Sequence, residues 1–264
     1  MKIDLTGKTA IVTGSTQGIG FASAAGLAAA GARTIITGRS EDSVNDALTR
    51  LKQAVPGAVA EGLAVDLATA EGCNTLVKSF PDPDILVNNV GIFGGKPFFE
   101  IEDQDWDKFF QTNVMSGVRL SRAYLQGMID RGWGRVVFIS SESAINIPAD
   151  MIHYGFTKTA MLSLSRGLAK LATGSGVTVN SVLPGPTQTA GVETMLQEQV
   201  EQSGKSFAEV GAEFVKSERP SSLLGRLAQP EEVANLVVYT CSPQASATTG
   251  AALRGEGGIV ETIT

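Results

Sequence analysis

The feature that most constrains the fold of this chain is a repeated alternation of short apolar segments with segments of helical length. Short, continuous apolar runs are typical of strands buried on both faces, and parallel strands need crossover connections, usually helices. We therefore expect an α/β fold, a doubly wound parallel sheet flanked by helices on both faces. The expected strands are Thr9 to Thr13, Thr34 to Thr37, Val59 to Val65, Ile85 to Asn88, Arg135 to Ser140 and Val177 to Leu183.

The chain reads as one domain spanning residues 1–264. Its 264 residues, 43% of them hydrophobic, suffice for one large core, and no repeat or low-complexity linker marks a boundary. Residues 190–222 interrupt the alternation because they are polar and helix-prone. We interpret this stretch as a substrate-covering lid, with a solvated surface insertion as the alternative.

Composition argues against several classes of function. The formal net charge is −6 and the basic residues are scattered, which disfavours binding to nucleic acid or to an anionic membrane surface. Cys73, Cys241 and the single histidine, His153, form no disulfide framework and no metal cluster. No apolar run reaches the roughly 20 residues of a membrane span, so we expect a soluble, cytoplasmic protein without bound metal.

A glycine-rich turn follows the first expected strand. It reads Thr13-Gly-Ser-Thr-Gln-Gly-Ile-Gly20 and leads into an alanine-rich helix closed by Gly31. Glycines allow a tight turn and a close approach to a pyrophosphate, and a helix N-terminus offers unpaired N–H groups. The order of strand, turn and helix predicts a dinucleotide site of the Rossmann type.

Arg39 follows the second expected strand, where NAD-preferring folds carry an acidic residue. Its guanidinium suits a 2′-phosphate, so we expect NADP(H) as the preferred cofactor. Because Glu41 and Asp42 lie close by, NAD(H) stays open as the alternative cofactor. Arg39 could alternatively be a solvated surface residue without a cofactor contact. Asp66, after the third strand, can accept from an adenine amino group, cap the following helix, or do both.

The expected chemistry centres on Tyr154 and Lys158, whose spacing of four places both on one face of a helix. A lysine ammonium beside a phenol favours the phenolate and makes a general acid/base. Ser141, at the end of the fifth expected strand, can donate to a substrate oxygen. Asn113 lies within an expected helix, where asparagine is unfavourable unless its side chain has a polar role.

Together these motifs resemble the short-chain dehydrogenase/reductase family over essentially the whole chain. The matching motifs are Thr13 to Gly20, Asn88-Asn-Val-Gly91, Asn113, Ser141 with Tyr154-x-x-x-Lys158, and Leu183 to Thr189. Gly225 to Leu227, Pro230 to Ala234, Thr249-Gly250 and Gly257-Gly258 are similar to the family's closing segment.

The resemblance implies a hydride transfer between NADP(H) and a carbonyl or alcohol. By this resemblance Tyr154 is the general acid, Ser141 holds the substrate oxygen, Lys158 lowers the tyrosine pKa and binds the nicotinamide ribose, and Asn113 holds a water. The expected cofactor contacts are Gly14, Ser15, Thr16, Gln17, Gly18, Ile19, Gly20, Arg39, Asp66, Leu67, Asn88, Gly91, Tyr154, Lys158, Pro184, Gly185, Thr187 and Thr189.

Three positions depart from the family pattern. Val90 stands where alanine is usual and adds bulk beside the adenosine cleft. Glu256 replaces a common aspartate before the terminal glycine pair. Gln17 is neutral where many NADP-preferring relatives carry a cation, so the NADP(H) preference depends on Arg39.

Other functions stay open beside the leading one. They are an NAD-dependent alcohol dehydrogenase, a non-catalytic dinucleotide-binding protein, and a reductase of 3-oxoacyl chains on a carrier protein, for which Arg119, Arg122 and Arg131 are weak docking candidates. We expect a small, moderately hydrophobic carbonyl or alcohol as substrate, with a pocket drawn from Phe93, Phe98, Phe99, Ile147, Met151 and Met195. His153 is expected to be a packing or surface residue and not a proton-transfer group. The resemblance also implies a homo-oligomer, a tetramer or a dimer.

Overall fold

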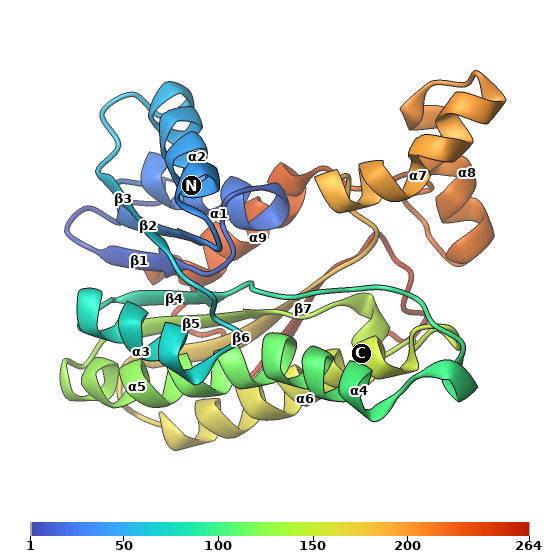
Figure 1. The fold of residues 1–264 in the computed structure, drawn as a ribbon. Coiled ribbons are helices and arrows are strands. Elements are labelled where there is room, and N and C mark those ends of the chain that lie inside the picture. The colour runs from blue at the N-terminus through green and yellow to red at the C-terminus, as the bar shows by residue number, and fades with distance from the viewer. Residues whose placement is uncertain (1, 264) are drawn as a thin grey trace.

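A parallel seven-stranded sheet forms the centre of the molecule in a computed structural model, which describes residues 2–263 (Figure 1). Its strand order is β3-β2-β1-β4-β5-β6-β7, and every paired strand runs parallel to its neighbour. The order reverses between β1 and β4, which is where such sheets bind ligands. The strands are β1 (Thr9–Val12), β2 (Arg33–Gly38), β3 (Ala60–Ala64), β4 (Ile85–Asn88), β5 (Gly134–Ile139), β6 (Val177–Pro184) and β7 (Ala252–Gly255).

The expected fold class is confirmed, and all six expected strands are present within a residue or so of their predicted bounds. The seventh strand, β7, was not expected. It lies at the sheet edge, and its residues Ala252 to Gly255 are exposed or half-buried in alternation, so it lacks the apolar run that marks the other strands.

Helices cover both faces of the sheet (Figure 1). One face carries α1, α2 and α9, and the other carries α3, α4, α5 and α6. The main helices are α1 (Gly18–Ala29), α2 (Glu41–Ala54), α3 (Ala70–Ser79), α4 (Asp103–Phe110), α5 (Ser116–Asp130), α6 (Ile152–Leu171), α7 (Ala190–Ser203), α8 (Phe207–Glu218) and α9 (Pro230–Cys241). Short turns are η1 (Phe98–Glu100), the π-helical turn η2 (Gln111–Met115), η3 (Glu142–Ala144) and η4 (Pro243–Ala245).

The hydrophobic core divides into two layers because neighbouring strand residues face opposite sides of the sheet. In β1, Val12 packs toward Leu27 of α1, whereas Ile11 packs in the layer that contains Leu120 of α5. Strands buried on both faces therefore need apolar residues at nearly every position, which explains the runs in the sequence.

Residues 190–222 form helices that project away from the sheet (Figure 1). Leu196 of α7 packs with Val210 and Val215 of α8 and with Leu227 in a small cluster separate from the two main layers. This stretch is polar and helix-prone because α7 and α8 each bury only a few residues and expose the rest.

Among residues 2–263, no helix combines the length and the apolar composition that crossing a bilayer requires.

Two helical glycines provide a test of how tightly the sheet and α5 pack. A Cβ at Gly117 would lie 2.9 Å from the ring of Phe138 in β5, whereas a Cβ at the exposed Gly167 of α6 meets nothing within 4 Å. We expect Gly117→Ala to lower the free energy of unfolding by about 1–3 kcal/mol through overpacking. The matched control Gly167→Ala should raise it by up to about 1 kcal/mol, because alanine is the better helix former. Urea unfolding measures both, and equal effects would contradict the packing argument.

Candidate active site

The glycine-rich turn closes tightly at the carboxyl end of β1. Gly14 (φ 60°) and Gly18 (φ 56°) adopt the left-handed conformation that favours glycine. A Cβ at Gly20 would lie 2.4 Å from the Asn89 side-chain amide, so no larger residue fits there. Helix α1 starts at Gly18 without a side-chain cap from Gln17, which leaves its first N–H groups available to an anion. These features fit a dinucleotide pyrophosphate.

Asn89 braces this turn, a role that our sequence analysis missed. Its Nδ2 donates to the carbonyl oxygens of Thr13 (2.8 Å) and Gly14 (2.9 Å), and its backbone N–H donates to Thr13 Oγ1 (2.8 Å). The neighbouring Asn88 is buried, and its side chain donates to Ser121 of α5 (3.4 Å). The paired asparagines in the sequence were a signal, but only the geometry shows which one supports the turn.

The adenine end is open and polar. Arg39 and Asp66 are both exposed at the carboxyl ends of β2 and β3, while Leu67 is buried. The expectation that Asp66 caps the next helix is wrong, because Thr69 accepts the capping bond from Gly72 N–H (3.0 Å) and Asp66 instead accepts from the Ala68 N–H. The carboxylate of Asp66 thus lies outside the helix.

Arg50, in the last turns of α2, is a second cation at this end that sequence reasoning missed. Its Nη2 donates to the carbonyl oxygen of Thr16 (2.5 Å), and its guanidinium lies 4.4 Å from the ring centroid of Phe21. Asp46 pairs with it at 2.8 Å. The separation of 34 residues between Arg50 and Thr16 hides this contact from a sequence pattern.

Ser141, Tyr154 and Lys158 come together where β5 and α6 meet. The ammonium of Lys158 is buried, donates to the Ile139 carbonyl oxygen (2.9 Å) and lies 5.6 Å from the Tyr154 ring centroid. The Tyr154 hydroxyl lies near enough to the Ser141 side chain for the serine to affect its pKa. Gly91 lies beside them, since its Cβ would be 3.4 Å from the Lys158 Nζ.

Burial and nearby charges shift the pKa values of both Tyr154 and Lys158. Burial raises the pKa of the Tyr154 phenol above its usual value, the hydrogen bond with Ser141 opposes this, and the carboxylate of Glu142 adds to it. Burial also lowers the pKa of Lys158 to about 8, while Glu142 acts to raise it. Burial is thus the largest influence on both groups, and it favours the neutral phenol of Tyr154.

Asn113 lies in the π-helical turn η2, between α4 and α5. Its Oδ1 accepts from Ile92 N–H (2.8 Å), and its Nδ2 donates to the Ile92 carbonyl oxygen and to Thr157 Oγ1 (both 3.0 Å). Its amide therefore has the polar role that an asparagine inside a helix requires. Such π turns are frequent at functional sites.

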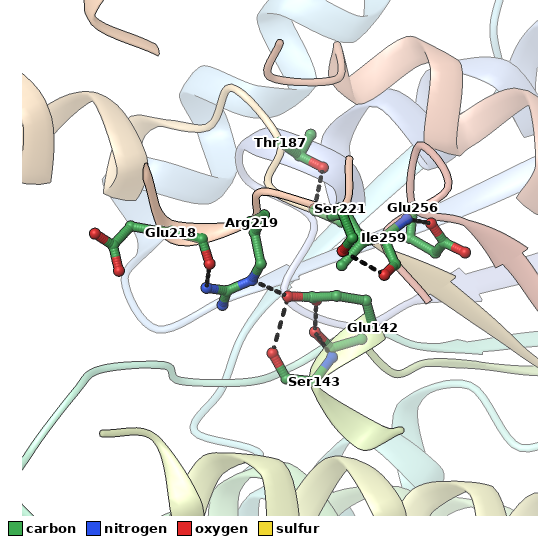
Figure 2. Close-up of polar contacts among 10 residues, drawn as sticks. Glu142, Ser143, Thr187, Glu218, Arg219, Ser221, Glu256 and Ile259 are labelled. Atoms are coloured by element: carbon green, nitrogen blue, oxygen red, sulfur yellow. Dashed lines mark hydrogen bonds and ion pairs between the residues drawn. The ribbon is translucent and has the colours of Figure 1, made fainter. Parts of the chain in front are cut away.

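A largely buried ion pair joins Glu142 and Arg219 (Figure 2). Glu142 accepts from Arg219 Nε (2.8 Å), Ser143 Oγ (3.0 Å) and Ser141 Oγ (2.5 Å). Arg219 follows α8, so it connects the projecting helices to the end of β5. Sequence reasoning missed this pair, which spans 77 residues.

The segment after β6 faces the glycine turn. A Cβ at Gly185 would lie 2.6 Å from the Glu256 carbonyl oxygen, and Thr187 Oγ1 donates to the Gly185 carbonyl oxygen (2.9 Å). Thr189 caps α7, and its methyl group would lie 3.1 Å from a Cβ at Gly18. Pro184 ends β6. The structure thus brings this stretch against the turn at the start of α1.

The residues expected to line a substrate pocket or a docking surface have the following exposures and contacts. The apolar candidates Phe93, Phe98, Phe99, Ile147 and Met195 are exposed, and Met151 is half-buried. Of the docking candidates, Arg119 bonds to the Ala68 carbonyl and Arg131 to Asp82. His153 is buried against Trp106 and Phe109, as expected for a packing residue. Within residues 2–263 no group of His, Cys, Asp and Glu is arranged to hold a metal.

Comparisons with known proteins place this geometry in a family. The short chain dehydrogenase model matches residues 8–200. The uncharacterized oxidoreductase YvaG of Bacillus subtilis is 51% identical over 263 residues, with 100% of each chain covered. The 3-oxoacyl-[acyl-carrier-protein] reductase FabG of Aquifex aeolicus is 34% identical, covering 98% of this chain and 100% of its own.

A solved structure supports the same family assignment through its fold. The L-sorbose reductase of Gluconobacter frateurii, complexed with NADPH and L-sorbose, superimposes with a TM-score of 0.92 at 31% identity, with both chains covered fully. The expected resemblance is therefore confirmed, and the chain is an oxidoreductase that belongs to the short chain dehydrogenase family.

Proposed function

We propose that this oxidoreductase uses NADP(H) to reduce a small carbonyl compound, or to oxidise the corresponding alcohol, with Tyr154 as the general acid/base. The convergence of Ser141, Tyr154 and Lys158 at the end of β5, on the same edge of the sheet as the glycine turn, carries the proposal. An NADPH-bound relative of similar structure supports the choice of cofactor.

The residues that would hold the cofactor fit its chemistry. Gly14 and Gly18 leave backbone accessible to the pyrophosphate, and Gly20 lets the turn pack against Asn89. Thr189 lies against the same turn, Thr187 belongs to the same segment, and the exposed Arg39 would meet a 2′-phosphate. Ser15, Thr16, Gln17, Ile19, Asp66, Leu67, Asn88, Gly91, Pro184 and Gly185 complete the proposed contacts. When bound, NADPH supplies the hydride that reduces the carbonyl carbon.

The chain's own groups would handle the oxygen and its proton. Tyr154 donates its proton to the carbonyl oxygen as that oxygen gains charge, and its raised pKa keeps it protonated before the step. Lys158, charged below about pH 8, stabilises the resulting phenolate. Ser141 orients the substrate oxygen, and Asn113 fixes the backbone beside Lys158.

Residues 190–222 belong to this proposal as a lid over the substrate. Arg219 of this segment reaches Glu142 beside the catalytic serine (Figure 2), so closure of the segment is linked to the site through a buried ion pair. A solvated surface insertion would not be expected to carry a largely buried guanidinium that pairs with Glu142.

The cofactor preference is tested at Arg39. We expect the wild-type protein to bind NADPH at least about tenfold more tightly than NADH, or about 1.4 kcal/mol, and Arg39→Ala to lose that difference. Fluorescence titration of both cofactors measures it. Arg33→Ala is the matched control, because Arg33 lies at the opposite end of β2 and pairs with Glu61. Equal binding of NADH by the wild type would favour an NAD-dependent dehydrogenase instead.

The role of Tyr154 is tested by removing its hydroxyl. Tyr154→Phe should lower kcat for carbonyl reduction by about 10²- to 10⁴-fold, as expected for loss of a general acid, with NADPH affinity unchanged. Tyr124→Phe is the control, since the buried Tyr124 hydroxyl has no hydrogen-bond partner among residues 2–263. A Tyr154→Phe protein with near-normal turnover would rule out the assigned role.

The pH profile tests Lys158. Burial lowers the pKa of Lys158 to about 8, so the ammonium is present below that pH and is lost as the pH rises through it. We expect kcat/KM for reduction to be level below about pH 8 and to fall above it. Lys158→Arg keeps its charge at every accessible pH, so its residual activity should lack this fall. A wild-type profile that stays level to about pH 10 would contradict the assignment.

A further inference from the structure

Glu142 is a buried carboxylate beside the reacting groups, and the proposed chemistry does not use it. Its side chain is 5% exposed, and Arg219, its ion-pair partner, is 14% exposed. Replacing a buried ion pair by apolar residues is often neutral for stability or favourable, so stability alone is a weak reason for this pair. Glu142 accepts a hydrogen bond from Ser141, and this position brings it close to where a substrate would bind.

The hydrogen bonds of Ser141 limit what this serine can do. A hydroxyl has one proton to donate. Ser141 Oγ directs its proton to Glu142 Oε2 (2.5 Å), while it accepts from the Ser143 N–H (3.1 Å). In this arrangement Ser141 has no proton left for a substrate oxygen.

A substrate hydroxyl resolves this conflict. If it donates to Glu142 Oε2, it takes the place of the serine proton, and Ser141 can then donate to the carbonyl oxygen that Tyr154 protonates. Ser141 Oγ and Glu142 Oε2 are only 2.5 Å apart, so the two substrate oxygens that they bind lie close together, as oxygens on adjacent carbons do. A plain ketone must break the Ser141–Glu142 hydrogen bond without replacing it.

The charge of the pair argues for a neutral substrate. Arg219 Nε and Ser143 Oγ both bind Glu142 Oε1, so the guanidinium is already compensated by a carboxylate. A substrate carboxylate at this place would face the negative charge of Glu142 at close range. A neutral hydroxyl meets an acceptor there without repulsion.

We propose that Glu142, held in place by Arg219, binds a hydroxyl on the carbon next to the reacting carbonyl, so that the substrates are neutral α-hydroxy ketones or aldehydes and the corresponding vicinal diols. This inference rests on the proposed carbonyl reduction and names its substrate class. It replaces the moderately hydrophobic carbonyl expected from the sequence.

The test compares two ketones with the same carbon skeleton, 3-hydroxybutan-2-one and butan-2-one, using the full-length protein and NADPH. We expect the wild-type kcat/KM to favour the hydroxy ketone by about 10- to 100-fold, the range of one hydrogen bond to a charged group. Glu142→Gln should reduce this ratio to below about threefold, because kcat/KM falls for the hydroxy ketone and stays the same for butan-2-one. NADPH binding by fluorescence should be unchanged in both proteins.

Two further variants keep the result interpretable. The double variant Glu142→Gln with Arg219→Gln removes the uncompensated buried charge that the single variant leaves, and it should show the same low ratio. Glu232→Gln makes the same substitution in the exposed pair with Arg226, far from Ser141 in the sequence, and should keep the wild-type ratio.

Each outcome decides between the inference and the proposed function. Equal wild-type reduction of the two ketones overturns the inference and leaves carbonyl reduction intact. A Glu142→Gln protein that loses the same factor on both ketones also overturns it, since Glu142 then only positions Ser141. Preferred reduction of the anionic 2-oxobutanoate would assign Arg219 to a carboxylate instead. Reduction of none of these compounds or of a wider carbonyl panel, with NADPH still bound, would defeat the proposed function itself.

Discussion

The site depends on how the chain holds β1 and β4 together at the point where the strand order reverses. Thr13 Oγ1 donates to the Val87 carbonyl oxygen and accepts from the N–H groups of Asn89 and Val90, and the Asn89 amide binds the backbone of the turn. These buried contacts fix the glycine turn relative to the end of β4. The turn that would hold a pyrophosphate is positioned by these contacts.

The reacting groups follow a second constraint, which is burial. Lys158 is buried and Tyr154 is half-buried where α6 packs on the sheet, and burial shifts the pKa values of both from their ordinary values. The same burial makes every nearby polar atom matter, because a partner lost in a dry site is not replaced by water. A single carboxylate such as Glu142 can therefore influence Ser141, Tyr154 and Lys158 together.

The fold and the proximity of Ser141, Tyr154 and Lys158 could be predicted from the sequence, for local reasons. Strands buried on both faces leave an apolar run, and a spacing of four residues places Tyr154 and Lys158 on one side of α6. The edge strand β7 carries no such run and was missed. The contacts of Asn89, Arg50 and Glu142 were also missed, because each joins residues brought together only by the folded sheet. The desolvation that raises the pKa of Tyr154 is likewise a property of packing.

The separate hydrophobic cluster of α7 and α8 has a consequence for how such proteins diversify. Leu196, Val210, Val215 and Leu227 pack mainly with one another, apart from the two layers that stabilise the sheet. The family match ends at residue 200, within α7, before the segment that delivers Arg219. A unit with its own small core can change in sequence and length while the sheet stays intact. Selection can thus alter which compounds the protein accepts without disturbing how it handles the hydride and the proton.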